Sequence, residues 1–96
     1  MSMNGKFKLK GINYDVDLTD NHSEVRSVNN YRIERTSENS IKLVIFSNVS
    51  EKEFLFITNK ISRYLLTAGI ITAKELQNLE DELLDIWMFK NFGYTE

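Results

Sequence analysis

Polar and apolar residues alternate in the first half of the chain, and this alternation predicts β-strands. One segment carries four apolar side chains at two-residue spacing: Ile12, Tyr14, Val16 and Leu18. That period is typical of a strand with one buried face. The alternation has the opposite phase in residues 6–9, which either a bulge or a two-residue turn at Lys10-Gly11 would explain. If it is the turn, Phe7 faces Tyr14 in the resulting register.

Residues 24–46 contain further strand signals and two predicted turns. Asn29-Asn30 predicts a second hairpin, because asparagine tolerates left-handed backbone angles. Residues 37–40, Ser-Glu-Asn-Ser, form the other turn. It leads into residues 41–46, which are apolar on both sides, as expected for a central strand or one covered by helices.

The second half of the chain changes to helical periodicity. Ser50 and Glu53 form a capping box that predicts the start of a helix, and Gly69 predicts its end. Thr72 and Glu75 form a second capping box. In the first segment, the apolar residues at three- and four-residue steps are Phe54, Ile57, Ile61, Tyr64, Leu65 and Ala68. Leu55, Phe56 and Leu66 widen this apolar stripe. In the second segment, the stripe consists of Leu76, Leu79, Leu83, Ile86 and Trp87.

These elements predict a single α+β domain over residues 1–96. We expect an antiparallel β-meander of four to five strands over residues 6–47. An αα-hairpin over residues 50–90 follows it and packs on one face of the sheet. The chain has 96 residues, of which 42% are hydrophobic and 27% charged, a balance that supports one small globular domain.

The predicted hairpin resembles a known family at the residues around its turn. The pattern is Leu65-Leu66-x-x-Gly69-Ile70-Ile71-Thr72-x-x-Glu75-Leu76, followed by Leu79, Leu83 and Leu84. It resembles the helical hairpin of the short C-terminal domain family SHOCT and related hairpins of small phage and Gram-positive proteins. This family usually has an acidic residue and an aromatic residue where this chain has Lys74 and Leu76. The resemblance implies association with another chain and brings no catalytic residues.

The composition excludes several classes of function. The chain lacks cysteine, so it has no disulfide framework and no thiolate zinc site. A net charge of −2 provides no general attraction for nucleic acid or for an anionic membrane. The most apolar region, residues 54–71, is interrupted by Asn59, Lys60 and Arg63, so we expect no membrane span. With no apolar secretory signal at its start, the chain is expected to be cytoplasmic.

His22 is the only histidine and the first candidate for chemistry. With Asp20 and Glu24 it could hold a metal or act as a general base, but a lone histidine in a polar loop is more often exposed to solvent. No motif pairs His22 with a nucleophile, and none marks a phosphate-binding loop. We expect no enzymatic activity, no cofactor and no metal.

Residues 80–92 combine acidic side chains with an aromatic end. The partner-binding candidates here are Glu80, Asp81, Asp85, Met88, Phe89 and Phe92. We expect the three acids on a solvated face opposite the apolar stripe. The last three residues cannot all join that stripe, because successive residues of a helix are about 100° apart. Either the tail of residues 88–94 packs as core, or it leaves an aromatic patch exposed.

The first half of the chain offers an alternative site, a basic face that binds nucleic acid. Its candidates are Lys6, Lys8, Lys10, Arg26, Arg32 and Arg35. However, strand alternation separates the lysines of residues 6–10 from the apolar residues between them, whereas stacking platforms place aromatics beside the charges. Lysines on an edge strand also prevent aggregation through that edge. The hairpin is not expected to read DNA, because its second helix is mainly acidic.

The sequence therefore favours a small non-enzymatic protein that binds another protein chain. Apolar anchors beside charged residues are the composition of an interface, and residues 80–92 supply both. An inhibitor or regulator of a host protein, encoded by a phage or mobile element, is one role of this kind. A subunit of a larger assembly or a homodimer is another.

Overall fold

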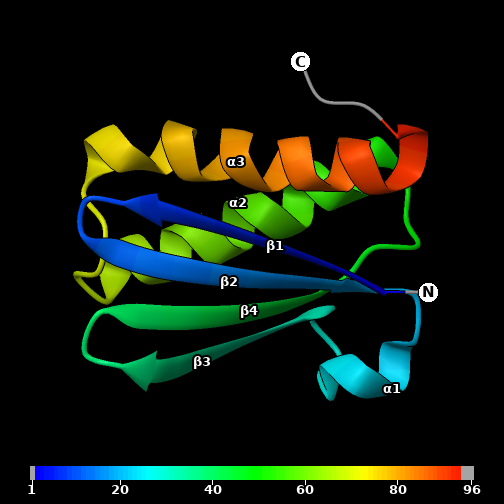
Figure 1. Ribbon diagram of the computed structural model, residues 1–96, viewed down its shortest axis with the longest axis horizontal. Coiled ribbons are helices and arrows are strands. Elements are labelled where there is room, and N and C mark those ends of the chain that lie inside the picture. Colours follow the sequence, from blue (N-terminus) through cyan, green and yellow to red (C-terminus); the bar gives the residue numbers. More distant parts are fainter. Residues whose placement is uncertain (1, 94–96) are drawn as a thin grey trace. The chain divides into compact units, whose positions relative to one another are not determined.

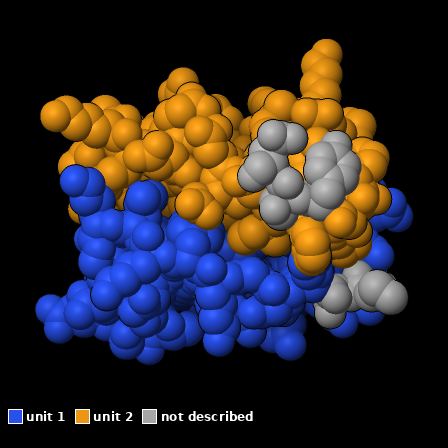
Figure 2. Space-filling model, turned by 45° about the horizontal axis from the view of Figure 1, so that its top comes forward, with its two compact units in different colours: residues 1–49 blue, residues 50–96 orange. Residues whose placement is uncertain are grey.

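The computed structural model describes residues 2–93 of the chain and has an α+β fold (Figure 1). The elements in chain order are β1 (Ser2–Leu9), β2 (Ile12–Thr19), α1 (His22–Val25), β3 (Tyr31–Ser37), β4 (Ser40–Phe46), α2 (Glu51–Thr67) and α3 (Ala73–Phe92). Contacts divide the chain into two compact units, Met1–Val49 and Ser50–Glu96, which Figure 2 shows in different colours. The first unit holds the sheet and α1, and the second holds α2 and α3. No helix within residues 2–93 is long and apolar enough to cross a membrane.

The sheet is mixed, which corrects the expectation of a purely antiparallel meander. Its strand order is β1-β2-β4-β3 (Figure 1), with β2 and β4 parallel and the other two pairings antiparallel. In a meander β3 would lie beside β2, but β4 takes that place. The continuous apolar run of β4 explains the difference, because such a strand is best buried at the centre, whereas the more polar β3 tolerates an edge.

The hairpin expected around Asn29-Asn30 is also wrong. Residues 22–25 form the short helix α1, capped by Asn21, whose side chain accepts a hydrogen bond from the Ser23 backbone N–H at 3.1 Å. Arg26 then turns the chain with φ +60°. Val25 is fully buried, so this segment contributes to the core through a helical turn and does not form a strand. The left-handed backbone expected of asparagine is present at Asn30, with φ +68°.

The first hairpin has the predicted turn and register. Lys10 and Gly11 both have positive φ, +52° and +85°, as a type I′ turn requires. Phe7 pairs with Tyr14, and their rings stack with centroids 5.0 Å apart. The buried hydrophobic residues of the first unit come mainly from β2 and β4: Tyr14, Val16, Leu18, Val25, Ile41, Leu43, Val44 and Ile45.

The two ends of α2 and the start of α3 are where the sequence placed them, whereas α3 continues to Phe92, beyond the expected end at residue 90. The side chain of Ser50 caps α2 and accepts a hydrogen bond from the Glu53 backbone N–H at 3.1 Å. After α2, Gly69 has φ +77°, and the next backbone N–H donates back to the Leu65 carbonyl at 2.9 Å, a Schellman motif. At the start of α3 the Glu75 carboxylate accepts from the Thr72 backbone N–H at 3.0 Å.

The buried stripe of each helix is narrower than the sequence suggested. The buried residues are Phe54, Ile57, Thr58, Ile61, Ser62 and Leu65 in α2, and Glu75, Leu79, Leu83 and Trp87 in α3. Tyr64, which was expected in the stripe, is 56% exposed. Leu55 and Phe56, expected to widen it, are 40% and 61% exposed. A helix buries only the side chains within its inward arc, and these three residues lie outside it.

Candidate interaction surface

Two contacts fix how α2 and α3 lie against each other. The rings of Phe54 and Trp87 stack, with centroids 5.3 Å apart. About one and a half turns further along α2, the side-chain amide of Asn59 donates a hydrogen bond to the Glu80 carboxylate at 2.9 Å. Residue numbers therefore rise along α2 as they fall along α3, so the helices are antiparallel. The start of α2 lies level with the end of α3.

Glu80 belongs to this helix–helix contact, which corrects the expectation that it lies on the solvated face. Its Oε2 accepts hydrogen bonds from Asn59 Nδ2 and from the buried Ser62 hydroxyl, both at 2.9 Å. Glu80 makes these contacts because it lies about 100° around the axis of α3 from the buried Leu79, on the side where α2 lies. Its carboxylate connects the two helices through these two hydrogen bonds.

The other partner-binding candidates form a line on the outside of α3. Asp81, Asp85, Met88 and Phe92 recur at steps of four, three and four residues, so they follow one face of the helix. The two aspartates are exposed and Met88 is half-buried. Phe92 is 57% exposed, and Phe89, which flanks this line, is 44% exposed. We call these five residues the acidic–aromatic strip.

The end of α3 decides between the two alternatives for the aromatic tail, as far as it is described. The helix continues to Phe92 and ends at Gly93, whose backbone N–H donates to the Phe89 carbonyl at 2.8 Å. The Phe92 ring contacts Trp87 edge-on at 6.0 Å, yet more than half of the side chain stays exposed. An aromatic patch is therefore left at the surface, while Tyr94 lies outside the described residues.

A second strip, on α2, was not foreseen from the sequence. Lys52, Phe56, Lys60 and Arg63 are all exposed and recur at steps of four, four and three residues. The Lys60 ammonium lies 4.9 Å from the centre of the Phe56 ring, a cation–π contact. We call these four residues the basic–aromatic strip. Their spacing in the sequence could have revealed it, but Phe56 was assigned to the buried stripe.

A hollow of about 530 Å³ lies beside the first turns of α2. Leu55 and Phe56 supply its apolar wall, and Lys52 and Asn59 are among the polar residues at its edge. Because the start of α2 is level with the end of α3, this hollow lies at the same end of the hairpin as Met88 and Phe92.

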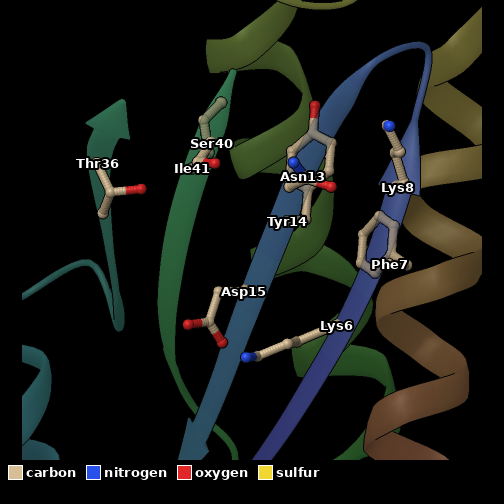
Figure 3. Close-up of a pocket in the computed structure, with 9 residues that line it drawn as sticks. All are labelled: Lys6, Phe7, Lys8, Asn13, Tyr14, Asp15, Thr36, Ser40 and Ile41. Carbon is tan, nitrogen blue, oxygen red and sulfur yellow. The ribbon is translucent and has the colours of Figure 1, made fainter. Parts of the chain in front are cut away.

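Another hollow, of about 520 Å³, lies on the sheet (Figure 3). Lys6, Asp15 and Lys8 are among its lining residues, and Figure 3 shows the charged ends of Lys6 and Asp15 turned toward each other. The register extends this arrangement, because Asp15 is paired with Lys42 and Lys42 with Glu34. Charges of alternating sign thus cross the four strands, which stabilises the register and leaves little net charge.

The basic candidates of the first half are dispersed over the first unit. Lys6 and Lys8 lie on β1, Lys10 in the turn and Arg26 after α1. Arg32 forms an ion pair with Glu34 and donates to the Glu24 and Val25 carbonyls. Arg35 donates to the Ser37 and Glu38 carbonyls, 3.2 and 2.7 Å away, and its strand position places it on the other face from Arg32. The six cations do not gather into one basic surface.

His22 is exposed at the start of α1. Its Nε2 lies 2.9 Å from Asn30 Oδ1, and its ring meets Phe46 edge-on at 5.2 Å. These contacts connect α1 to the neighbouring loop and strand. Within residues 2–93 no group of three or more His, Asp or Glu side chains is arranged to hold a metal.

Comparison with known proteins adds no further assignment. The chain matches no protein-family model, no curated protein and no solved structure. The helical pair at residues 51–92 is present, but its resemblance to the SHOCT hairpin stays a prediction.

Proposed function

We propose that this protein acts by binding another protein through the acidic–aromatic strip of α3, without catalysing a reaction. The observation that supports the proposal is the exposure of Phe89 and Phe92 on the same helix face as Asp81 and Asp85. Aromatic side chains anchor interfaces because they bury a large apolar area with few rotatable bonds, and nearby charges orient the partner.

Such a surface is sufficient for a regulator or inhibitor that occupies the surface of a target protein. We place this binding in the cytoplasm, and an origin in a phage or mobile element is part of the same proposal. A nucleic-acid partner is less well supported, because the candidate cations are dispersed and interleaved with Asp15 and Glu34.

The test combines capture and melting measurements on the same variants. The immobilised wild-type chain and the Phe89→Ala and Phe92→Ala variants are incubated with lysate of the native host, and bound proteins are quantified by mass spectrometry. Val28→Ala is the matched control, because Val28 is a 92% exposed apolar residue of the other unit. A specific target should be retained by the wild type and the control, and its retention should fall about 30-fold on loss of an anchor, which corresponds to about 2 kcal/mol.

Melting separates this interpretation from a structural role. If the two phenylalanines were core residues, their truncation would cost about 3–5 kcal/mol of folding stability. A large loss of melting temperature in both variants, with unchanged retention of the same host proteins, would contradict the proposal.

A further inference from the structure

We infer that the acidic–aromatic strip binds a second copy of this chain, whose basic–aromatic strip lies over it. This inference rests on the proposed function, since it names the partner of the surface proposed above. Three features of the helical unit support it: the side of the hairpin on which the strips lie, their charges, and the position of the hollow on α2.

Both strips lie on the same side of the hairpin. Around α2 the order is the buried stripe, then Asn59, which contacts α3, and then the basic–aromatic strip. Around α3 the order is the buried stripe, then Glu80, which contacts α2, and then the acidic–aromatic strip. Because the order is the same on two antiparallel helices, both strips face away from the buried side. They form one continuous outer face.

The charges on this outer face are complementary between its two halves. The α2 half carries Lys52, Lys60 and Arg63, and the α3 half carries Asp81 and Asp85, with one cation, Lys74, two turns before Asp81 on the same face. A two-fold axis parallel to the helices places the α2 half of one copy over the α3 half of the other, and the reverse contact forms at the same time. In this arrangement the cations on α2 of each copy face the aspartates on α3 of the other copy, so the same contact forms twice. A two-fold interface requires such self-complementarity of one patch.

The same rotation does not move any residue along the direction of the helix axes, so residues at the same height along the hairpin stay at the same height in the dimer. Intrachain pairs at equal level include Phe54 with Trp87 and Asn59 with Glu80. Lys60 of one copy therefore lies near Asp81 of the other, because each is one residue away from the Asn59–Glu80 level. The end of the opposing α3 comes to lie over the hollow walled by Leu55 and Phe56. Met88 of the second copy, which is level with about residue 53, is the apolar side chain that would enter it.

The size of the outer face sets the expected strength of the dimer. Two helices side by side present a surface about 20 Å wide and about 25 Å long, so about 500 Å² per copy and about 1,000 Å² in total. This is the lower limit for a specific interface, and we expect a dissociation constant of about 1–100 µM.

The test is sedimentation equilibrium of charge-reversed variants over a concentration range that spans this interval. Lys60→Glu and Asp81→Lys should each weaken the dimer at least about tenfold, because each places like charges at two symmetric contacts. An equimolar mixture of the two variants should recover dimer. In the mixed pair one contact keeps the original Lys60–Asp81 attraction, and the other joins the two substituted side chains, whose charges are also opposite. Lys8→Glu and Glu38→Lys are the matched controls, because both residues are exposed and belong to the other unit.

Circular dichroism checks that each variant folds, and Arg63→Glu replaces Lys60→Glu if that variant does not. A wild-type chain that stays monomeric throughout the range would overturn the inference. A dimer that persists in both reversed variants would also overturn it, as would a mixture that stays monomeric. If the dimer fails while a host protein is still captured through Phe92, the proposed function stands and only this inference is lost.

Discussion

The Glu80 carboxylate is predicted to be a main source of stability for the helical hairpin. Replacing it by alanine removes both hydrogen bonds that reach across from α2, one from Asn59 and one from Ser62. Hydrogen bonds to a charged group are worth about 1.5–3 kcal/mol each. Glu80 is half-buried, which favours the lower end of that range.

The two bonds are not equally costly to lose. The Ser62 hydroxyl also lies within 3.0 Å of the Thr58 carbonyl and 3.1 Å of the Asn59 carbonyl, so it keeps an acceptor in the variant. Asn59 keeps its contact with Arg63, but that contact uses the amide oxygen and leaves the Nδ2 donor to solvent. We therefore expect Glu80→Ala to lower the free energy of unfolding by about 2–3 kcal/mol, and the melting temperature by about 10–20 °C.

Urea titration followed by tryptophan fluorescence provides the assay. Trp87 is the only tryptophan of the chain, and its ring lies in the contact between the two helices. Glu82→Ala is the control, because it removes the same charge from an exposed position two residues further along α3. Asn59→Ala completes a double-mutant cycle, for which we expect a coupling of about 1 kcal/mol with Glu80→Ala. Equal and small losses in the Glu80 and Glu82 variants would refute the reasoning.

Two further predictions concern the sheet. Lys10→Asn should raise the free energy of unfolding by about 0.5–1 kcal/mol, because asparagine tolerates the φ of +52° that the turn imposes on Lys10. Urea titration checks this, and a loss of stability would show that the turn does not strain Lys10. Asp15→Lys should lower stability by about 1–2 kcal/mol, because it places a cation between Lys6 and Lys42 and removes the 2.6 Å hydrogen bond from Asn4. Part of that loss should disappear at high salt, and a loss independent of salt would point to the hydrogen bond alone.

The features that could be predicted from the sequence are those that neighbouring residues determine. Lys10-Gly11 fixes a hairpin register because a two-residue turn leaves only one way to pair the flanking strands. The ends of α2 and α3 depend on contacts within a few residues, such as Thr72 with Glu75. Each of these predictions depends only on residues within the segment itself.

The position of β4 could not be obtained in this way. Its insertion between β2 and β3 depends on a competition among strands that are distant in the chain, and the sequence pattern shows only that β4 is apolar on both sides. The placement of Glu80 was missed for a related reason. Periodicity shows which residues face away from Leu79, but not on which side of α3 the other helix lies.

The aromatic residues on the two strips stay partly exposed, although Phe56 contacts Lys60 and Phe92 contacts Trp87 within the same unit. Phenylalanine has a lower helix propensity than lysine, glutamate or leucine, so propensity alone does not favour it at an exposed helix position. Single exposed apolar residues are common, but Phe56, Phe89 and Phe92 are exposed on one hairpin, with a half-buried Met88 among them. Their presence is therefore best accounted for by a contact that covers them, and the oppositely charged rows beside them indicate that a second hairpin of the same kind can supply it.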